Sequence, residues 1–95
     1  MTEPNPHKPV VAISVEIVLM RRGGPQYQLV LARLERYYNC KIFDCFEHPD
    51  YLKSVLREVY GGEYQKIVEQ IQWELGESAS EPDVKKFLDV LKKDN

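Results

Sequence analysis

Apolar residues recur at intervals of three and four over most of the chain, which is the spacing of one face of an α-helix. Four such segments follow residue 24. The first carries Tyr27, Val30, Leu31, Leu34, Tyr37 and Tyr38. The other three carry Leu52, Val55, Leu56 and Val59; then Tyr64, Ile67, Val68, Ile71 and Leu75; and last Val84, Phe87, Leu88 and Leu91. The pattern therefore predicts four helices.

Residues that begin or end helices stand at the edges of these segments. Pro25 suits a first helical turn, where its missing N–H costs nothing. Gly61 and Gly76 are suited to the left-handed conformation that ends a helix. Ser80 and Asp83 have the spacing of a capping box, which predicts that the last helix begins at Ser80.

The segment from Val10 to Arg22 fits two periods. An alternation typical of a strand runs through Ile13, Val15, Ile17 and Leu19, while a helical face runs through Val11, Val15, Val18 and Arg22. Its many β-branched side chains favour a strand. A lone strand needs a partner, however, and the neighbouring segment from Gln26 to Leu34 is helical by its period. We therefore predict a helix and keep the strand as the alternative.

The first nine residues contain three prolines and almost nothing apolar. Prolines fix the backbone and remove hydrogen-bond donors, which disfavours a helix in this stretch. We therefore expect a disordered arm over residues 1–9 and a single helical domain over residues 10–95. The predicted fold is all-α, a compact bundle of about five short helices.

The composition bounds the function. Ninety-five residues suffice for one domain, and 43% hydrophobic with 29% charged residues is typical of a folded globular chain. A formal net charge of -2 argues against the broad basic field of a non-specific nucleic-acid binder. The chain shows no complete catalytic motif, phosphate loop or four-ligand metal cluster. We expect no enzymatic activity, no catalytic residue, no cofactor and no bound metal.

The expected location is the cytoplasm. Two cysteines are too few for a disulfide-rich secreted scaffold, and the first residues lack the order of a signal peptide. The most apolar run, from Val10 to Met20, is about half the length needed to cross a bilayer. We therefore expect no membrane span and no membrane partner.

One stretch carries a resemblance to a known family. It reads Asp44-Cys45-Phe46-Glu47-His48-Pro49-Asp50-Tyr51-Leu52, then Val55-Leu56, Val59-Tyr60-Gly61, Tyr64 and Ile67-Val68. From about Ile17 to Leu91 the chain resembles the small all-helical output domain of signalling proteins from ammonia-oxidising archaea. That resemblance implies an all-helical domain with a regulatory or interaction role, and it carries over no catalytic residue.

Two cysteines and a histidine lie close together in the chain. Cys40, Cys45 and His48, with Asp44 between them, could supply zinc ligands, a disulfide or a cysteine nucleophile with a base. Structural zinc sites usually draw on two separated pairs of ligands, and a short disulfide loop restrains the unfolded chain little. We favour inert thiols, with Phe43, Cys45 and Phe46 packed into the core.

The candidate contact residues fall into two groups. Trp73 lies off the apolar face of its predicted helix and, with Tyr37 and Tyr38, is a candidate for binding protein, although Trp73 could instead pack against the last helix. Five basic residues are the candidates for binding nucleic acid: Arg21, Arg22, Arg33, Arg36 and Lys41. We favour a non-enzymatic regulatory or adaptor module that binds another protein or itself as a homodimer. The alternative is a small nucleic-acid-binding regulator.

Overall fold

The structure is a computed structural model that describes residues 6–93. Every regular element in this range is helical. The elements are α1 (His7–Arg22), α2 (Gln26–Tyr38), η1 (Ile42–Phe46), α3 (Pro49–Tyr60), η2 (Gly61–Glu63), α4 (Tyr64–Leu75), η3 (Gly76–Ser80) and α5 (Pro82–Lys92), where η marks a 3-10 helix. No strand occurs in this part of the chain. The all-α prediction and the helical interpretation of the segment from Val10 to Arg22 are confirmed.

Helix α1 begins earlier than the sequence predicts. Pro9 lies in its first turn, where a missing N–H is tolerated. His7 Nδ1 lies 2.9 Å from Asp83 Oδ2, and Lys8 Nζ donates to Glu47 Oε1 at 2.9 Å. These contacts fix the first turn, so the arm expected over residues 1–9 is corrected at residues 7–9. Pro6 directly precedes the helix as its N-cap, and residues 1–5 of that prediction lie outside the described residues.

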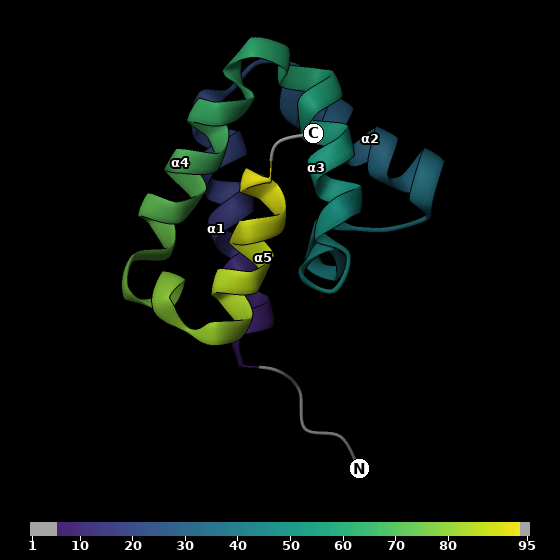
Figure 1. Cartoon of the computed structure of the whole chain (residues 1–95). Helices are drawn as coiled ribbons and strands as arrows, with labels where there is room; N and C mark the ends of the chain where they lie inside the picture. The colour runs from purple at the N-terminus through teal and green to yellow at the C-terminus, as the bar shows by residue number, and fades with distance from the viewer. Residues whose placement is uncertain (1–5, 94–95) are drawn as a thin grey trace.

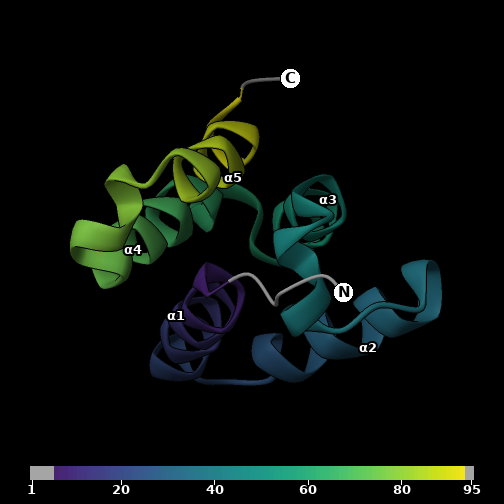
Figure 2. The same cartoon turned by 90° about the horizontal axis from the view of Figure 1, so that it is seen from below.

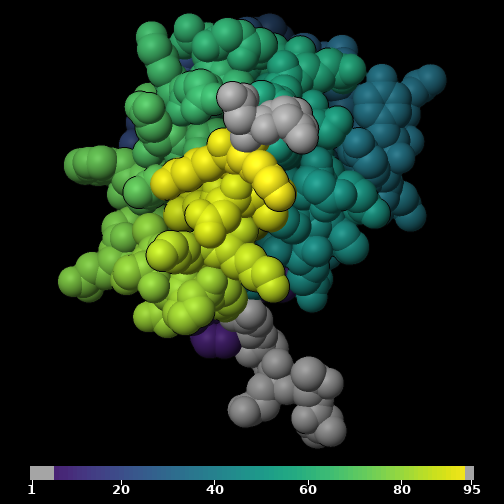
Figure 3. Space-filling view, viewed as in Figure 1, coloured from purple at the N-terminus to yellow at the C-terminus, as the bar shows by residue number. Residues whose placement is uncertain are grey.

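Helix α1 contacts α4 and η1, while α3 contacts α2 and α5, and α4 contacts α5. Figure 1 shows α5 in front of α1, with α4 to the left and α2 to the far right. In the view from below, α1 lies beside α4 and at the edge of the molecule away from α5 (Figure 2). Figure 3 shows α5 covering the middle of the front face.

One hydrophobic core joins all five α-helices. Its fully buried members include Val15, Leu19, Leu34, Leu52, Leu56, Ile67, Ile71 and Leu91. One buried hydrogen bond ties the start of α4 to the end of α5, because the Tyr64 hydroxyl donates to the Leu91 carbonyl at 2.7 Å. No helix in the described range 6–93 has the length and apolar character needed to cross a bilayer.

The helix ends agree with the sequence at two glycines and differ at one cap. Gly61 and Gly76 end α3 and α4 with φ of 54° and 57°, a conformation that favours glycine. The capping box predicted at Ser80 and Asp83 is wrong. Helix α5 begins at Pro82, and the Ser80 hydroxyl instead donates to the Glu77 carbonyl within η3 at 2.8 Å.

Two tyrosines give opposite expectations for loss of a hydroxyl. Tyr64→Phe removes the bond to Leu91 and leaves a carbonyl unpaired, so it should lower the free energy of unfolding by about 1–2 kcal/mol. Within residues 6–93 the Tyr60 hydroxyl oxygen is buried without a hydrogen-bond partner. Tyr60→Phe should therefore be neutral or stabilising. Urea denaturation measures both, and equal losses would contradict this assignment.

Candidate functional site

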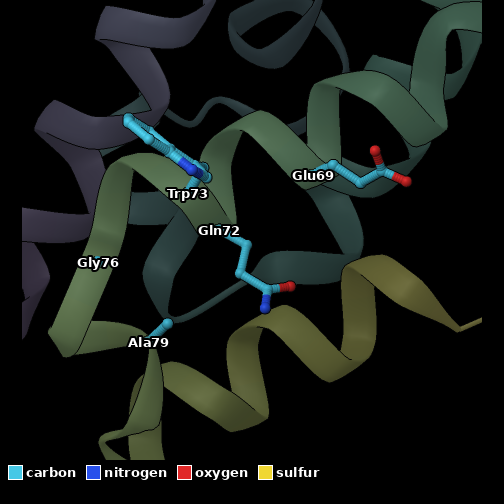
Figure 4. A pocket seen from close by; sticks show the side chains of 5 residues that line it. All are labelled: Glu69, Gln72, Trp73, Gly76 and Ala79. Atoms are coloured by element: carbon cyan, nitrogen blue, oxygen red, sulfur yellow. The ribbon is translucent and has the colours of Figure 1, made fainter.

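Trp73 is the most exposed large apolar side chain in the described part of the chain, with 82% of its surface exposed. The buried face of α4 is formed by Tyr64, Ile67, Ile71 and Leu75, which leaves position 73 on the opposite side of the helix. Figure 4 shows the indole projecting away from α5, whereas Gln72 points toward α5. The alternative that Trp73 packs against the last helix is therefore wrong.

The Trp73 surface, as we name it, comprises the five residues that line an open hollow of about 580 Å³. They are Glu69, Gln72, Trp73, Gly76 and Ala79, from α4 and η3 (Figure 4). Gly76 contributes no side chain to this surface, and no other atom lies within 4 Å of where its Cβ would be. The surface combines an exposed indole ring with a carboxylate and an amide, which suits it to recognition of a partner.

A second hollow continues this surface toward α5. It has a volume of about 350 Å³ and shares Gln72, Gly76 and Ala79 with the first. Lys85, Asp89 and Lys92 of α5 add charges of both signs along its far side. The two hollows together form a shallow depression over α4, η3 and α5.

The structure does not bring Tyr37 and Tyr38 to the Trp73 surface. They end α2, which lies on the opposite side of the molecule from α4 in both ribbon views (Figures 1 and 2). Tyr37 is 56% exposed. Tyr38 stacks on Tyr51 of α3, with ring centroids 4.2 Å apart, and so helps to hold α2 against α3. Tyr37 alone of the pair is free to contact a partner through most of its ring.

Three of the five basic candidates are held by carboxylates. Arg21 donates to Glu74 at 3.1 Å and Arg22 donates to Glu63 at 2.6 Å, which ties α1 to α4 and η2. Arg33 of α2 forms an ion pair with Glu58 of α3. These pairs join helices and neutralise much of the expected basic field.

The remaining two basic candidates, Arg36 and Lys41, are exposed, as is Arg21. Arg36 lies in the last turn of α2 and Lys41 lies just before η1. Sequence reasoning missed the acidic partners of the arginines, since those partners lie 25 to 53 positions away in the chain. No local pattern signals a pair at that separation.

Both cysteines lie in the core, which was expected for Cys45. Cys40 and Cys45 are both buried, their sulfurs are 3.9 Å apart, and neither forms a disulfide. Burial raises the pKa of both thiols, far above the usual range for Cys45. His48 is exposed and stacks on Tyr51, and the residues described include no group of three metal-ligating side chains. The structure thus presents neutral buried thiols.

The position of Phe43 differs from the one expected from the sequence. The five residues of η1 turn about every three residues, which places Ile42 and Cys45 on the inner side. Phe46 is partly buried and packs against Phe87, with ring centroids 5.8 Å apart. Phe43 is instead exposed, with Lys8 Nζ 4.7 Å from its ring centroid. The prediction that Phe43 packs into the core is wrong.

No family model, curated protein or solved structure matches this chain. The resemblance to the archaeal signalling output domain therefore stays a prediction, carried by the residues quoted for it.

The buried thiols predict how stability depends on pH. Folding raises the pKa of Cys40 and Cys45 above the unfolded value of about 8.5. Their contribution is complete below that pH and is lost as the pH rises, because only the unfolded chain releases the protons. Between about pH 8.5 and 10 each thiol should lower the free energy of unfolding by up to about 1.4 kcal/mol per pH unit.

The matched control is Cys40→Ala with Cys45→Ala. This double variant should lose stability at neutral pH through lost packing and then show a flatter pH dependence than the wild type over the same range. Tyrosines, with an ordinary pKa of about 10, begin to ionise within this range in both proteins, so the difference between the two curves isolates the thiols. Urea denaturation at closely spaced pH values measures the difference, and parallel curves for the two proteins would contradict the predicted role of the thiols.

Proposed function

We propose that this chain is a non-enzymatic module that binds another protein through the Trp73 surface. The observation that carries the proposal is the 82% exposed indole of Trp73 beside a shallow hollow. Tryptophan is among the residues that most often dominate the binding energy of protein interfaces. An indole combines a large apolar area with an N–H donor and few rotatable bonds, so fixing it in a complex costs little entropy.

The fold itself has no need of an indole at this position. The core already draws on all five α-helices, and Trp73 packs on the outside of α4. A polar helix-forming residue there would suit water and α4 equally well. Leaving most of a tryptophan in water is unfavourable for the free chain, and binding would recover that cost.

The surroundings of Trp73 define the chemistry of the partner. Glu69 and Gln72 line the hollow, and Glu74 lies next to Trp73 in the chain. These groups present acceptors and one negative charge at the rim, since Glu74 is engaged by Arg21. The matching partner surface has an apolar pocket for the indole, bordered by hydrogen-bond donors or a basic side chain.

We propose a regulatory or adaptor role for this module, in the cytoplasm. Its regulatory or adaptor character is supported by the resemblance to signalling output domains noted in the sequence. We propose the cytoplasm as the site of this binding, because two cysteines are too few for a disulfide-rich secreted scaffold.

Trp73→Ala tests the proposal. The variant should fold with unchanged helical circular dichroism, because the side chain lies outside the core. It should lower the affinity for the partner at least about 30-fold, the equivalent of about 2 kcal/mol. The partner is captured from nuclease-treated native lysate, identified by mass spectrometry and titrated by calorimetry. The matched control is Tyr37→Ala, which removes another exposed aromatic ring from α2, and equal affinities for both variants would contradict the proposal.

The arginines provide the test against nucleic acid. Changing Arg21, Arg22, Arg33 and Arg36 together to Ser removes three inter-helix ion pairs, each worth about 0.2–1 kcal/mol. The variant should therefore be less stable, while its affinity for the protein partner should fall only modestly. We expect no DNA or RNA binding of micromolar or tighter affinity at about 150 mM salt. Such binding, abolished by the four-Arg change and untouched by Trp73→Ala, would establish the nucleic-acid alternative instead.

A further inference from the structure

Helix α1 is apolar on two opposite sides. One side faces the core through Val11, Val15 and Val18. The other side carries Val10, Ile13, Ile17 and Met20, which we name the α1 seam. Val10, Ile13 and Met20 are 39%, 56% and 59% exposed, and Ile17 is partly exposed. A helix that packs on a core by one face needs polar residues on the other, so this second face lacks a partner.

The spacing of the α1 seam is that of a coiled-coil interface. Its steps of three, four and three place the residues at a and d positions of a heptad. Glu16 is the only charged residue between Lys8 and Arg21. Its Oε2 accepts from the Tyr27 hydroxyl on α2 at 3.5 Å, and Arg21 is directed to Glu74 on α4. The charges thus flank the seam and leave its apolar residues exposed.

We propose that two copies of this chain associate through the α1 seam, with the two α1 helices antiparallel. The seam is symmetric about position 15 in the sequence. In an antiparallel pair Ile13 therefore faces Ile17 of the second copy, and Val10 faces Met20 of the second copy. A two-fold interface requires this property, that residue i meets j while j meets i.

The charges at the two ends of α1 favour the same arrangement. Arg21 stands at the C-terminal end with 66% of its side chain exposed. At the N-terminal end His7 lies beside Glu81 and Asp83 of the η3–α5 junction. An antiparallel pair brings each Arg21 toward the acidic end of the other copy, and it also opposes the two helix dipoles. A parallel pair would place the two Arg21 side chains together.

The exposed area fits a weak, reversible dimer. The seam offers on the order of 300 Å² of apolar surface per copy, taking about 100–200 Å² for each fully exposed side chain. Interfaces are about 56–65% apolar, so this area corresponds to about 1,000 Å² buried in total. That total is close to the lower limit for a specific interface, so we expect a weak dimer.

This inference goes beyond the proposed function and does not rest on it. Trp73 lies on α4, across the Arg21–Glu74 ion pair from the seam. Figure 2 shows α1 and α4 side by side, with α1 at the edge of the molecule. The α1 seam is formed by α1 alone and the Trp73 surface by α4 and η3, so the two surfaces share no residue.

Sedimentation equilibrium of the full chain tests the dimer. Over about 5–500 μM the wild type should move from its monomer mass of 11.1 kDa toward twice that mass. Ile13→Glu with Met20→Glu should stay monomeric, because both side chains are more than half exposed in the free chain and would place charges inside the seam. The matched control, Leu29→Glu with Tyr37→Glu on α2, adds the same charge and should dimerise as the wild type does.

Cysteine cross-linking tests the register. When the Val10→Cys and Met20→Cys variants are mixed and oxidised, antiparallel pairing predicts links between position 10 of one copy and position 20 of the other. Links of position 10 to 10 and 20 to 20 would overturn the antiparallel arrangement. Each variant keeps the rest of the seam, so this readout does not depend on the glutamate pair folding.

A wild type that remains at monomer mass at the highest concentration overturns the inference, whether or not Trp73-dependent capture of another protein succeeds. A dimer that persists in the Ile13→Glu, Met20→Glu variant also overturns it. Trp73→Ala should leave the dimer intact. Loss of the dimer in Trp73→Ala alone would overturn the inference and indicate an interface on α4.

Discussion

Helix α1 buries Val11, Val15 and Val18 against its neighbours, and this packing places the other elements relative to one another. Helix α4 and the 3-10 helix η1 both contact α1, and ion pairs from Arg21 and Arg22 fix its last turn to α4 and η2. The position of α4 in turn decides which way Trp73 points. If α1 were displaced, the core would open between α4 and η1, and both proposed surfaces would lose their present geometry.

Local pattern was enough to predict most of the fold. The three-and-four spacing of apolar residues located α2 to α5, and the same spacing placed Trp73 off the buried face of α4. The ambiguity over Val10 to Arg22 has a physical origin, because α1 is apolar on two sides. Two apolar faces produce an alternation in the sequence as well as a helical period, so Ile13 and Ile17 looked like strand residues when they belong to an exposed helix face.

What the sequence could not predict depends on contacts between distant residues. The first turn of α1 is held by His7 against Asp83, 76 positions away, and nothing near His7 signals that contact. Phe43 lies outside the core with Lys8, 35 positions away, over its ring, and the paired arginines are engaged by carboxylates on other helices. These interactions are set by the packing of whole helices, which a periodic pattern does not specify.

The exposed Trp73 side chain is the proposed contact with another protein. Trp73 is the only tryptophan in the chain, so intrinsic fluorescence reports on this one side chain. In the free chain at low concentration, acrylamide should quench its emission almost as readily as that of free tryptophan. Adding the captured partner should shift the emission to shorter wavelength and protect it from quenching. A protected indole in the free chain, or an indole that stays fully quenchable in the saturated complex, would contradict the account.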